Sequence, residues 1–136
     1  MNHLGIGVKI VNHPESGRAA FSKGFLDYAK KCANGNVIIF NELINKSIPL
    51  IGIEPSAILS FRDEYIDIVD KELEEKARAL TQYCFTIEEY LFNLIQKGRI
   101  TADHFDKTQR RILVHGHCHQ KSLSDVTSSL KVLGIP

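Results

Sequence analysis

Three histidines and one cysteine lie within five consecutive residues near the end of the chain. They are His115, His117, Cys118 and His119, in the run His-Gly-His-Cys-His. Imidazole and thiolate groups are ligands for zinc and other borderline metals, so this loop is a candidate metal site. Neighbouring residues of an extended chain point to opposite sides, so not all four side chains would reach one ion. The alternative is that the run only joins a strand to the helix after it.

Two glutamates are candidates for acid–base chemistry. Glu54 directly follows an apolar run, and Glu15 lies in a predicted loop. Paired carboxylates at neighbouring strand ends can act as general acid and general base. A glutamate at a helix start has another role, because the free amides of the first turn favour a negative charge. The sequence leaves both interpretations open.

The cysteines do not predict a disulfide framework. There are three, Cys32, Cys84 and Cys118, and no two have Cys-x-x-Cys spacing. An odd number without paired spacing favours free thiols or metal ligands. Cys32 and Cys84 lie in helical or apolar contexts, which predicts small core residues rather than reactive thiols.

Three short apolar runs predict the strands that would position these residues. They are Val8–Val11, Ile48–Ile53 and Arg111–Val114, and each is followed by turn formers and then by a helical pattern. Such alternation predicts a Rossmann-like α/β fold with a small parallel sheet and flanking helices in a three-layer-like arrangement. Because ligands bind at the carboxyl edge of such sheets, we expect the three following loops to meet there. These loops are Pro14–Gly17, Glu54–Ala57 and His115–His119.

Several helices follow from periodicity and end signals. One predicted helix begins with the capping box from Thr86 to Glu89 and ends at Gly98. Ser56 is the predicted N-cap of a helix over 57–65. The remaining predicted helices cover 18–33, which Asn34-Gly35-Asn36 should end or interrupt, then 70–80 and 123–133. The run over 37–44 fits a strand or a helix by its pattern, and we favour a helix.

The composition is that of a soluble globular protein. The 136 residues fit one domain over 1–136, with 43% hydrophobic residues, 24% charged residues and a net charge of +1. The interspersed charges argue against a nucleic-acid partner. No apolar run is long enough to cross a membrane, and the first residues do not form a secretory signal, which favours the cytoplasm.

Three motifs together resemble a known family. They are His-Pro-Glu-Ser-Gly-Arg at 13–18, Gly-Ile-Glu-Pro-Ser-Ala-Ile-Leu-Ser-Phe-Arg-Asp-Glu-Tyr at 52–65 and His-Gly-His-Cys-His-Gln-Lys at 115–121. The pattern is similar to the cysteine-rich CCG iron–sulfur domain. That domain occurs in heterodisulfide reductases and glycolate oxidase iron–sulfur subunits, and at the C-terminus of FAD-linked D-lactate dehydrogenases. The likeness extends over nearly the whole chain.

The resemblance implies a degenerate first cluster site. The family's Cys-Cys-Gly falls on Glu15-Ser16-Gly17, and its Cys-x-x-Cys falls on the run from Glu54 to Ala57. The thiolates that iron prefers are therefore replaced at Glu15, Ser16, Glu54 and Ala57. Cys118 matches the lone first cysteine of a second copy, whose other cysteines would lie downstream.

The resemblance also implies a parent protein. That parent would be an FAD-linked oxidoreductase of 2-hydroxy acids, such as D-lactate or glycolate, that transfers electrons through 4Fe–4S clusters. The chain would be a fragment whose partner is the rest of that polypeptide or a flavoprotein subunit, with peripheral membrane association through the parent. By itself it would be inactive and hold no cofactor.

Two alternatives belong to other classes. One is a small metal-binding module or metal-dependent hydrolase that uses the histidine and cysteine loop with Glu54 as general base. The other is an independent small protein that kept the fold after losing its clusters and acts as an interaction module.

Overall fold

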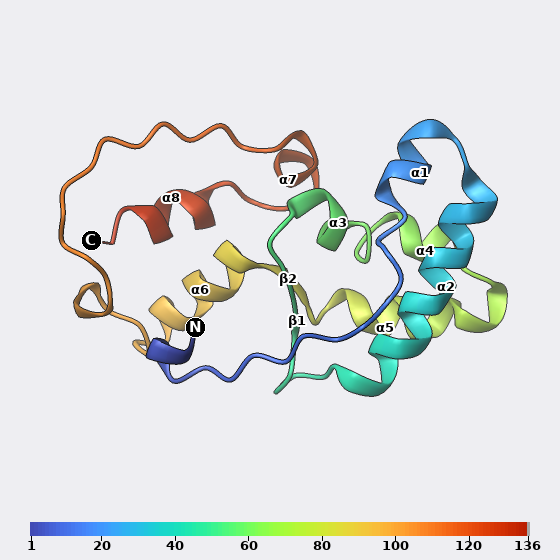
Figure 1. Ribbon diagram of the computed structural model, residues 1–136, viewed down its shortest axis with the longest axis horizontal. Helices are drawn as coiled ribbons and strands as arrows, with labels where there is room; N and C mark the ends of the chain where they lie inside the picture. Colours follow the sequence, from blue (N-terminus) through green and yellow to red (C-terminus); the bar gives the residue numbers. More distant parts are fainter. Residues whose placement is uncertain (136) are drawn as a thin grey trace. The chain divides into compact units, whose positions relative to one another are not determined.

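A computed structural model describes residues 1–135, which form two compact units (Figure 1). Unit 2 is the continuous stretch His13–Thr86, and unit 1 combines Met1–Asn12 with the chain from Ile87 onward. Each unit is described by itself. The prediction of a single domain over 1–136 stays a prediction.

Unit 2 contains a small parallel sheet flanked by helices, which confirms the α/β fold class. Strands β1 (Leu50–Gly52) and β2 (Cys84–Thr86) pair in parallel, with Ile51 opposite Phe85. The crossover between them contains α3 (Pro55–Leu59), α4 (Glu64–Ile68), the 3-10 turn η2 (Lys71–Leu73) and α5 (Glu74–Thr81). This β–helix–β connection is what a parallel pair requires. The predicted strand at 48–53 is therefore confirmed for residues 50–52, while Ile48 and Ile53 lie outside β1 and are exposed. Strand β2 was not predicted.

Two helices precede the sheet and supply much of its core. Helix α1 (Arg18–Lys23) ends at Gly24, whose φ of 76° is a left-handed conformation that favours glycine, and α2 (Leu26–Leu43) follows. The buried face of α2 carries small and aromatic residues: Ala29, Cys32, Ala33, Val37 and Phe40. It packs against α1, α4 and α5.

The predicted helix stop at Asn34-Gly35-Asn36 is wrong, because α2 continues through all three residues. Gly35 gives room for Pro14, since an added Cβ would lie 3.0 Å from its Cγ atom. Asn36 is fully buried and hydrogen bonded. Tertiary contacts at these positions offset the local preference of asparagine and glycine to end a helix.

Unit 1 is built mainly around two helices. They are α6 (Ile87–Gln96) and α8 (Thr127–Leu133), which pack together. Helix α6 confirms the helix predicted after Thr86. Two 3-10 turns, η1 (Asn2–Leu4) and η3 (Ala102–His104), and the short helix α7 (Cys118–Leu123) complete the unit. The single helix predicted over 123–133 is therefore wrong in its first turn.

Two predicted strands are absent from the part of the chain that the structure describes. Neither Val8–Val11 nor Arg111–Val114 belongs to a strand. Both runs are exposed, with Ile10 at 93% and Leu113 at 89% of full exposure. A strand needs a neighbour to receive its backbone hydrogen bonds, and neither run has one among residues 1–135.

Within residues 1–135, no helix combines the length and the apolar character that a membrane crossing requires.

Candidate functional site

A pocket of about 250 Å³ lies alongside β1 and the loop that follows it in unit 2. Its polar lining residues are His13, Ser16 and Glu54. The apolar walls are formed by Phe40, Leu50, Ile51, Gly52, Ile53, Ala57, Ile58 and Phe61. Two of the three predicted loops, Pro14–Gly17 and Glu54–Ala57, thus contribute to one pocket. The first of these loops does not follow a strand.

The close approach of β1 and α3 forms one wall of this pocket. A Cβ atom placed on Gly52 would lie 2.3 Å from Cβ of Ile58. Only glycine leaves room for Ile58 at this distance. The chain can therefore turn from β1 into α3 within two residues.

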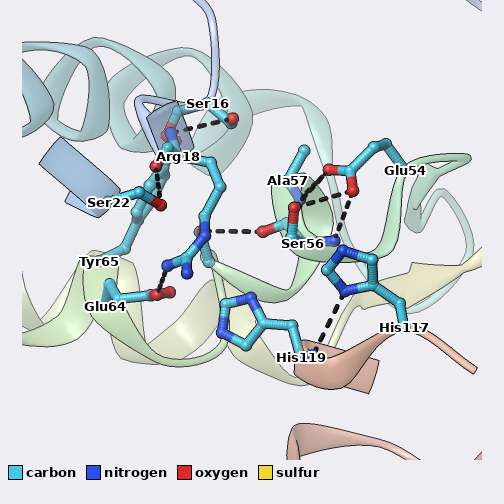
Figure 2. A network of polar contacts seen from close by, with 11 residues as sticks. Ser16, Arg18, Ser22, Glu54, Ser56, Ala57, Glu64, Tyr65, His117 and His119 are labelled. Carbon is cyan, nitrogen blue, oxygen red and sulfur yellow. Dashed lines mark hydrogen bonds and ion pairs between the residues drawn. The ribbon is translucent and has the colours of Figure 1, made fainter. Parts of the chain in front are cut away.

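Glu54 is the N-cap of α3. Its carboxylate accepts hydrogen bonds from the backbone amides of Ser56, at 3.1 Å, and Ala57 (Figure 2). It also accepts from the Ser56 hydroxyl at 2.8 Å. The predicted N-cap at Ser56 is thus wrong by two residues. Because three donors already hold the carboxylate, its structural role is established, and its role as a general base stays a prediction.

The loop before α1 is fixed by the buried side chain of Asn36. Its Nδ2 group donates to the carbonyl of Glu15 at 2.9 Å and to the Tyr65 hydroxyl at 3.0 Å. Its Oδ1 atom lies 2.9 Å from Nδ1 of His13. The Tyr65 hydroxyl in turn donates to the carbonyl of Ser16 at 2.9 Å. One buried amide therefore holds several residues of the loop.

Burial raises the pKa of Tyr65 well above its usual range, although the hydrogen bond from Asn36 acts in the opposite direction. The Tyr65 side chain is fully buried, and its ring centroid lies 4.4 Å from that of Phe61. The hydroxyl therefore stays protonated and acts as a donor in the folded protein.

Gly17 lets the loop pack against α2. Its φ is +71°, and an added Cβ would lie 3.3 Å from both Cα of Ala29 and Cβ of Cys32. Both the backbone conformation and the space favour glycine. Next to it, Arg18 at the start of α1 forms an ion pair with Glu64 of α4 (Figure 2).

Four residues occupy the positions of cluster ligands in the family pattern, and their surroundings differ. These residues are Glu15, Ser16, Glu54 and Ala57. Ser16, Glu54 and Ala57 line the pocket. Glu15 is not among its described lining residues. Its carboxylate instead accepts a hydrogen bond from Tyr28, which raises the pKa of that tyrosine to about 12.

The histidine and cysteine loop belongs to unit 1. Nδ1 of His117 accepts a hydrogen bond from the backbone amide of His119 at 3.3 Å, so His117 caps α7 (Figure 2). Cys118 is exposed at the first position of that helix, and His115 is also exposed. Within residues 1–135, no three of these four residues bring their ligand atoms within 4.8 Å of one another. The metal site at this loop stays a prediction.

The other two cysteines are core residues, as predicted. Cys32 and Cys84 are buried free thiols. Burial raises the pKa of Cys84 to about 12. A thiol with so high a pKa carries no nucleophilic thiolate near neutral pH.

Asn36 is the main site residue that the sequence analysis missed, and Tyr65 entered it only as the last residue of a motif, without a role. A signal for Asn36 was present, because it falls on the same helical face as Ala29, Cys32 and Phe40. A polar residue on an apolar face predicts a buried hydrogen-bonded group.

Comparison with known proteins gives two relatives and no family assignment. The chain is 32% identical over 69 residues to a D-2-hydroxyglutarate dehydrogenase of Haemophilus influenzae, in a region covering 51% of this chain and 7% of that protein. It is 31% identical over 62 residues to the D-2-hydroxyglutarate dehydrogenase of Escherichia coli K12, covering 46% of this chain and 6% of that protein. No family model and no solved structure matches.

These similarities associate part of the chain with a small part of two large dehydrogenases. Both relatives are dehydrogenases by name, and the chain spans less than a tenth of the length of each. The resemblance to the cysteine-rich CCG domain stays a prediction.

Proposed function

We propose that the chain is an α/β segment of a larger FAD-linked oxidoreductase that oxidises a small 2-hydroxy acid. The observation that carries this proposal is the 32% identity to a D-2-hydroxyglutarate dehydrogenase, of which the aligned region covers 7%. The three motifs of the CCG type add iron–sulfur electron transfer to the proposal. The parent would act in the cytoplasm, with the remaining polypeptide or a flavoprotein subunit as its partner.

The residues at the first cluster position do not fit an iron–sulfur cluster. Iron in these clusters is held by cysteine thiolates, and this position offers a serine hydroxyl, an alanine methyl group and two carboxylates. Glu54 is engaged as a helix cap and Glu15 by Tyr28. In our proposal unit 2 therefore contributes a protein scaffold to the parent, and its pocket holds no iron.

Cys118 is the one residue that we propose as a cluster ligand. Its side chain is exposed, so it is accessible to groups from elsewhere in the parent. A cluster needs several thiolates. The remaining ligands would come from the parent outside this sequence.

Iron analysis of the parent protein tests the ligand assignment. The gene region that surrounds this sequence is expressed anaerobically, and iron, acid-labile sulfide and flavin are measured together with low-temperature EPR spectra. We expect Cys118→Ser to lose or convert one cluster, whereas Glu54→Gln, the matched change in the pocket, leaves the iron content unchanged. An unchanged spectrum for Cys118→Ser would exclude Cys118 as a ligand.

Flavin reduction tests the substrate class. Under anaerobic conditions, D-2-hydroxyglutarate, D-lactate and glycolate are added in turn to the parent, and the loss of flavin absorbance is recorded. We expect at least one of these acids to reduce the flavin. A parent without bound flavin, or with a flavin that none of them reduces, would refute the proposal.

A further inference from the structure

The hydrogen-bond network around Asn36 determines which nitrogen of His13 carries the proton. Both Nδ2 protons of Asn36 are used, one by the carbonyl of Glu15 and one by the hydroxyl of Tyr65. The amide orientation is thus fixed, and Oδ1 can only accept. Nδ1 of His13, 2.9 Å away, must therefore be the donor.

This assignment leaves Nε2 of the neutral His13 ring as an acceptor with a free lone pair. The ring is held in place by Asn36 and by an edge-on contact with Phe40, at 5.0 Å between ring centroids. Asn36 is itself completely buried in α2. His13 is therefore an acceptor on a fixed support at the edge of the pocket.

The rest of the pocket lining is mainly apolar. Phe40, Ile58 and Phe61 are buried core residues that also line it. The hydroxyl of Ser16 accepts from the backbone amide of Arg18 at 3.3 Å, which leaves its own proton available. Glu54 is the only lining residue, among those described, with a formal charge at neutral pH. No lysine or arginine is among the described lining residues, so an anionic ligand would leave water there without gaining a permanently cationic partner.

We propose that this pocket binds a small uncharged molecule with an apolar body and one hydroxyl or N–H group, which donates to Nε2 of His13. Its volume of about 250 Å³ suits a ligand of one ring. The site lies entirely within unit 2 and does not depend on the proposed parent function. Because it disfavours anions, it differs from the site that would oxidise a 2-hydroxy acid.

Three matched probes test the proposal on the full wild-type chain. Phenol has the ring and the donor, toluene has the ring without the donor, and benzoate has the ring with a negative charge. Each is titrated into isotope-labelled protein, and NMR shifts of His13, Ser16 and Phe61 are followed. We expect all three residues to respond to phenol, with benzoate bound at least tenfold more weakly. Equal binding of benzoate, or no response to phenol, would overturn the proposal.

The tautomer of His13 has its own measurement. Long-range proton–nitrogen spectra show which ring nitrogen is protonated at a pH where the ring is neutral. We expect a protonated Nδ1, an unprotonated Nε2 and a shift of Nε2 on addition of phenol but not of toluene. A proton on Nε2 would overturn the assignment of the acceptor.

The variant His13→Leu removes the acceptor and keeps an apolar side chain. We expect phenol to bind about fivefold more weakly, the loss for one hydrogen bond of about 1 kcal/mol, while toluene binds as before. His3→Leu in η1 is the matched control and should leave both affinities unchanged. Undiminished phenol binding by His13→Leu would overturn the proposal. If the variant folds poorly, the titrations of the wild-type chain still test the proposal.

Discussion

The hydroxyl of Tyr65 donates a hydrogen bond of 2.9 Å to the backbone carbonyl of Ser16. This bond connects α4 to the loop before α1, across 49 positions of sequence. The same hydroxyl accepts from Asn36 of α2 at 3.0 Å. One buried oxygen therefore links three segments of unit 2.

Replacing Tyr65 by phenylalanine should lower the free energy of unfolding by about 1–3 kcal/mol, because the Ser16 carbonyl and one Asn36 proton lose their partner in a buried setting. Tyr90→Phe in α6 is the matched control on a half-buried tyrosine of unit 1. Denaturant unfolding of both variants measures the difference. Equal destabilisation would contradict the role of the Tyr65 hydroxyl.

Glu54→Ala should destabilise the chain by about 1 kcal/mol, because it removes the N-cap of α3. Glu54→Gln keeps one oxygen acceptor and should cost less. Glu72→Ala, at an exposed glutamate of η2, should change the stability by less than about 0.5 kcal/mol. Thermal melting ranks the three variants, and a Glu54→Ala variant as stable as Glu72→Ala would show that the cap contributes nothing.

Gly52→Ala should cost about 1–3 kcal/mol, because its Cβ would overlap Ile58. Gly7→Ala is the control, since a Cβ there meets no atom within 4 Å. Combining Gly52→Ala with Ile58→Gly should destabilise by less than the sum of the two single changes, because Ile58→Gly removes the Cβ atom that would lie 2.3 Å from the added one. Strict additivity in this double-mutant cycle would argue against the close contact.

Stability should fall at alkaline pH because of Cys84. Its pKa in the folded protein is about 12, compared with an ordinary value of 9.0. The thiol therefore contributes stability that is complete below pH 9 and is lost as the pH rises towards 12, since only the unfolded chain releases the proton in that window. Cys84→Ala should flatten the fall in unfolding free energy above about pH 9.

Val37, a buried residue without a titratable group, provides the control for this pH dependence. Val37→Ala should lower the stability at every pH and keep the alkaline fall of the wild type. Tyr65 acts in the same direction as Cys84, so some fall should remain in Cys84→Ala. A Cys84→Ala variant with an unchanged pH profile would contradict the prediction.

Local signals predicted some elements well. The strand at 48–53 is bounded by turn formers and covered by α3, and the helix after Thr86 has both start and stop signals. In these cases the local preference agrees with the tertiary contacts. Secondary structure can be predicted from sequence where local preference and tertiary contacts favour the same conformation.

The secondary-structure predictions are wrong where tertiary contacts, rather than local preference, determine the conformation of the chain. The pattern at Val8–Val11 fits a strand, but a strand forms only with a neighbour, and the alternation of residues does not specify one. The three-residue β2 was missed because such a short run has no clear period. The break expected at Asn34-Gly35-Asn36 fails because the contact with Pro14 and the hydrogen bonds of Asn36 are long-range.

The motifs that resemble the cysteine-rich domain contain residues of two loops that line one pocket. Ser16, Glu54 and Ala57 do line one pocket. Of the two groups that fix this pocket, Asn36 lies outside the three motifs, and Tyr65 is the last residue of the second motif but is not aligned with a cluster ligand. A motif contains the residues that would contact a ligand. The buried hydrogen bonds that hold those residues in place can come from other parts of the chain.

The division into units has a consequence for the order of folding during synthesis. Unit 2 is one uninterrupted stretch, and every residue of it has been translated once Thr86 is added. Unit 1 needs α8, almost at the end of the chain, to pair with α6. Domains generally form as they emerge from the ribosome. Unit 2 can therefore complete its core before α8 is translated, whereas residues 1–12 belong to a unit whose other residues all follow unit 2 in the sequence.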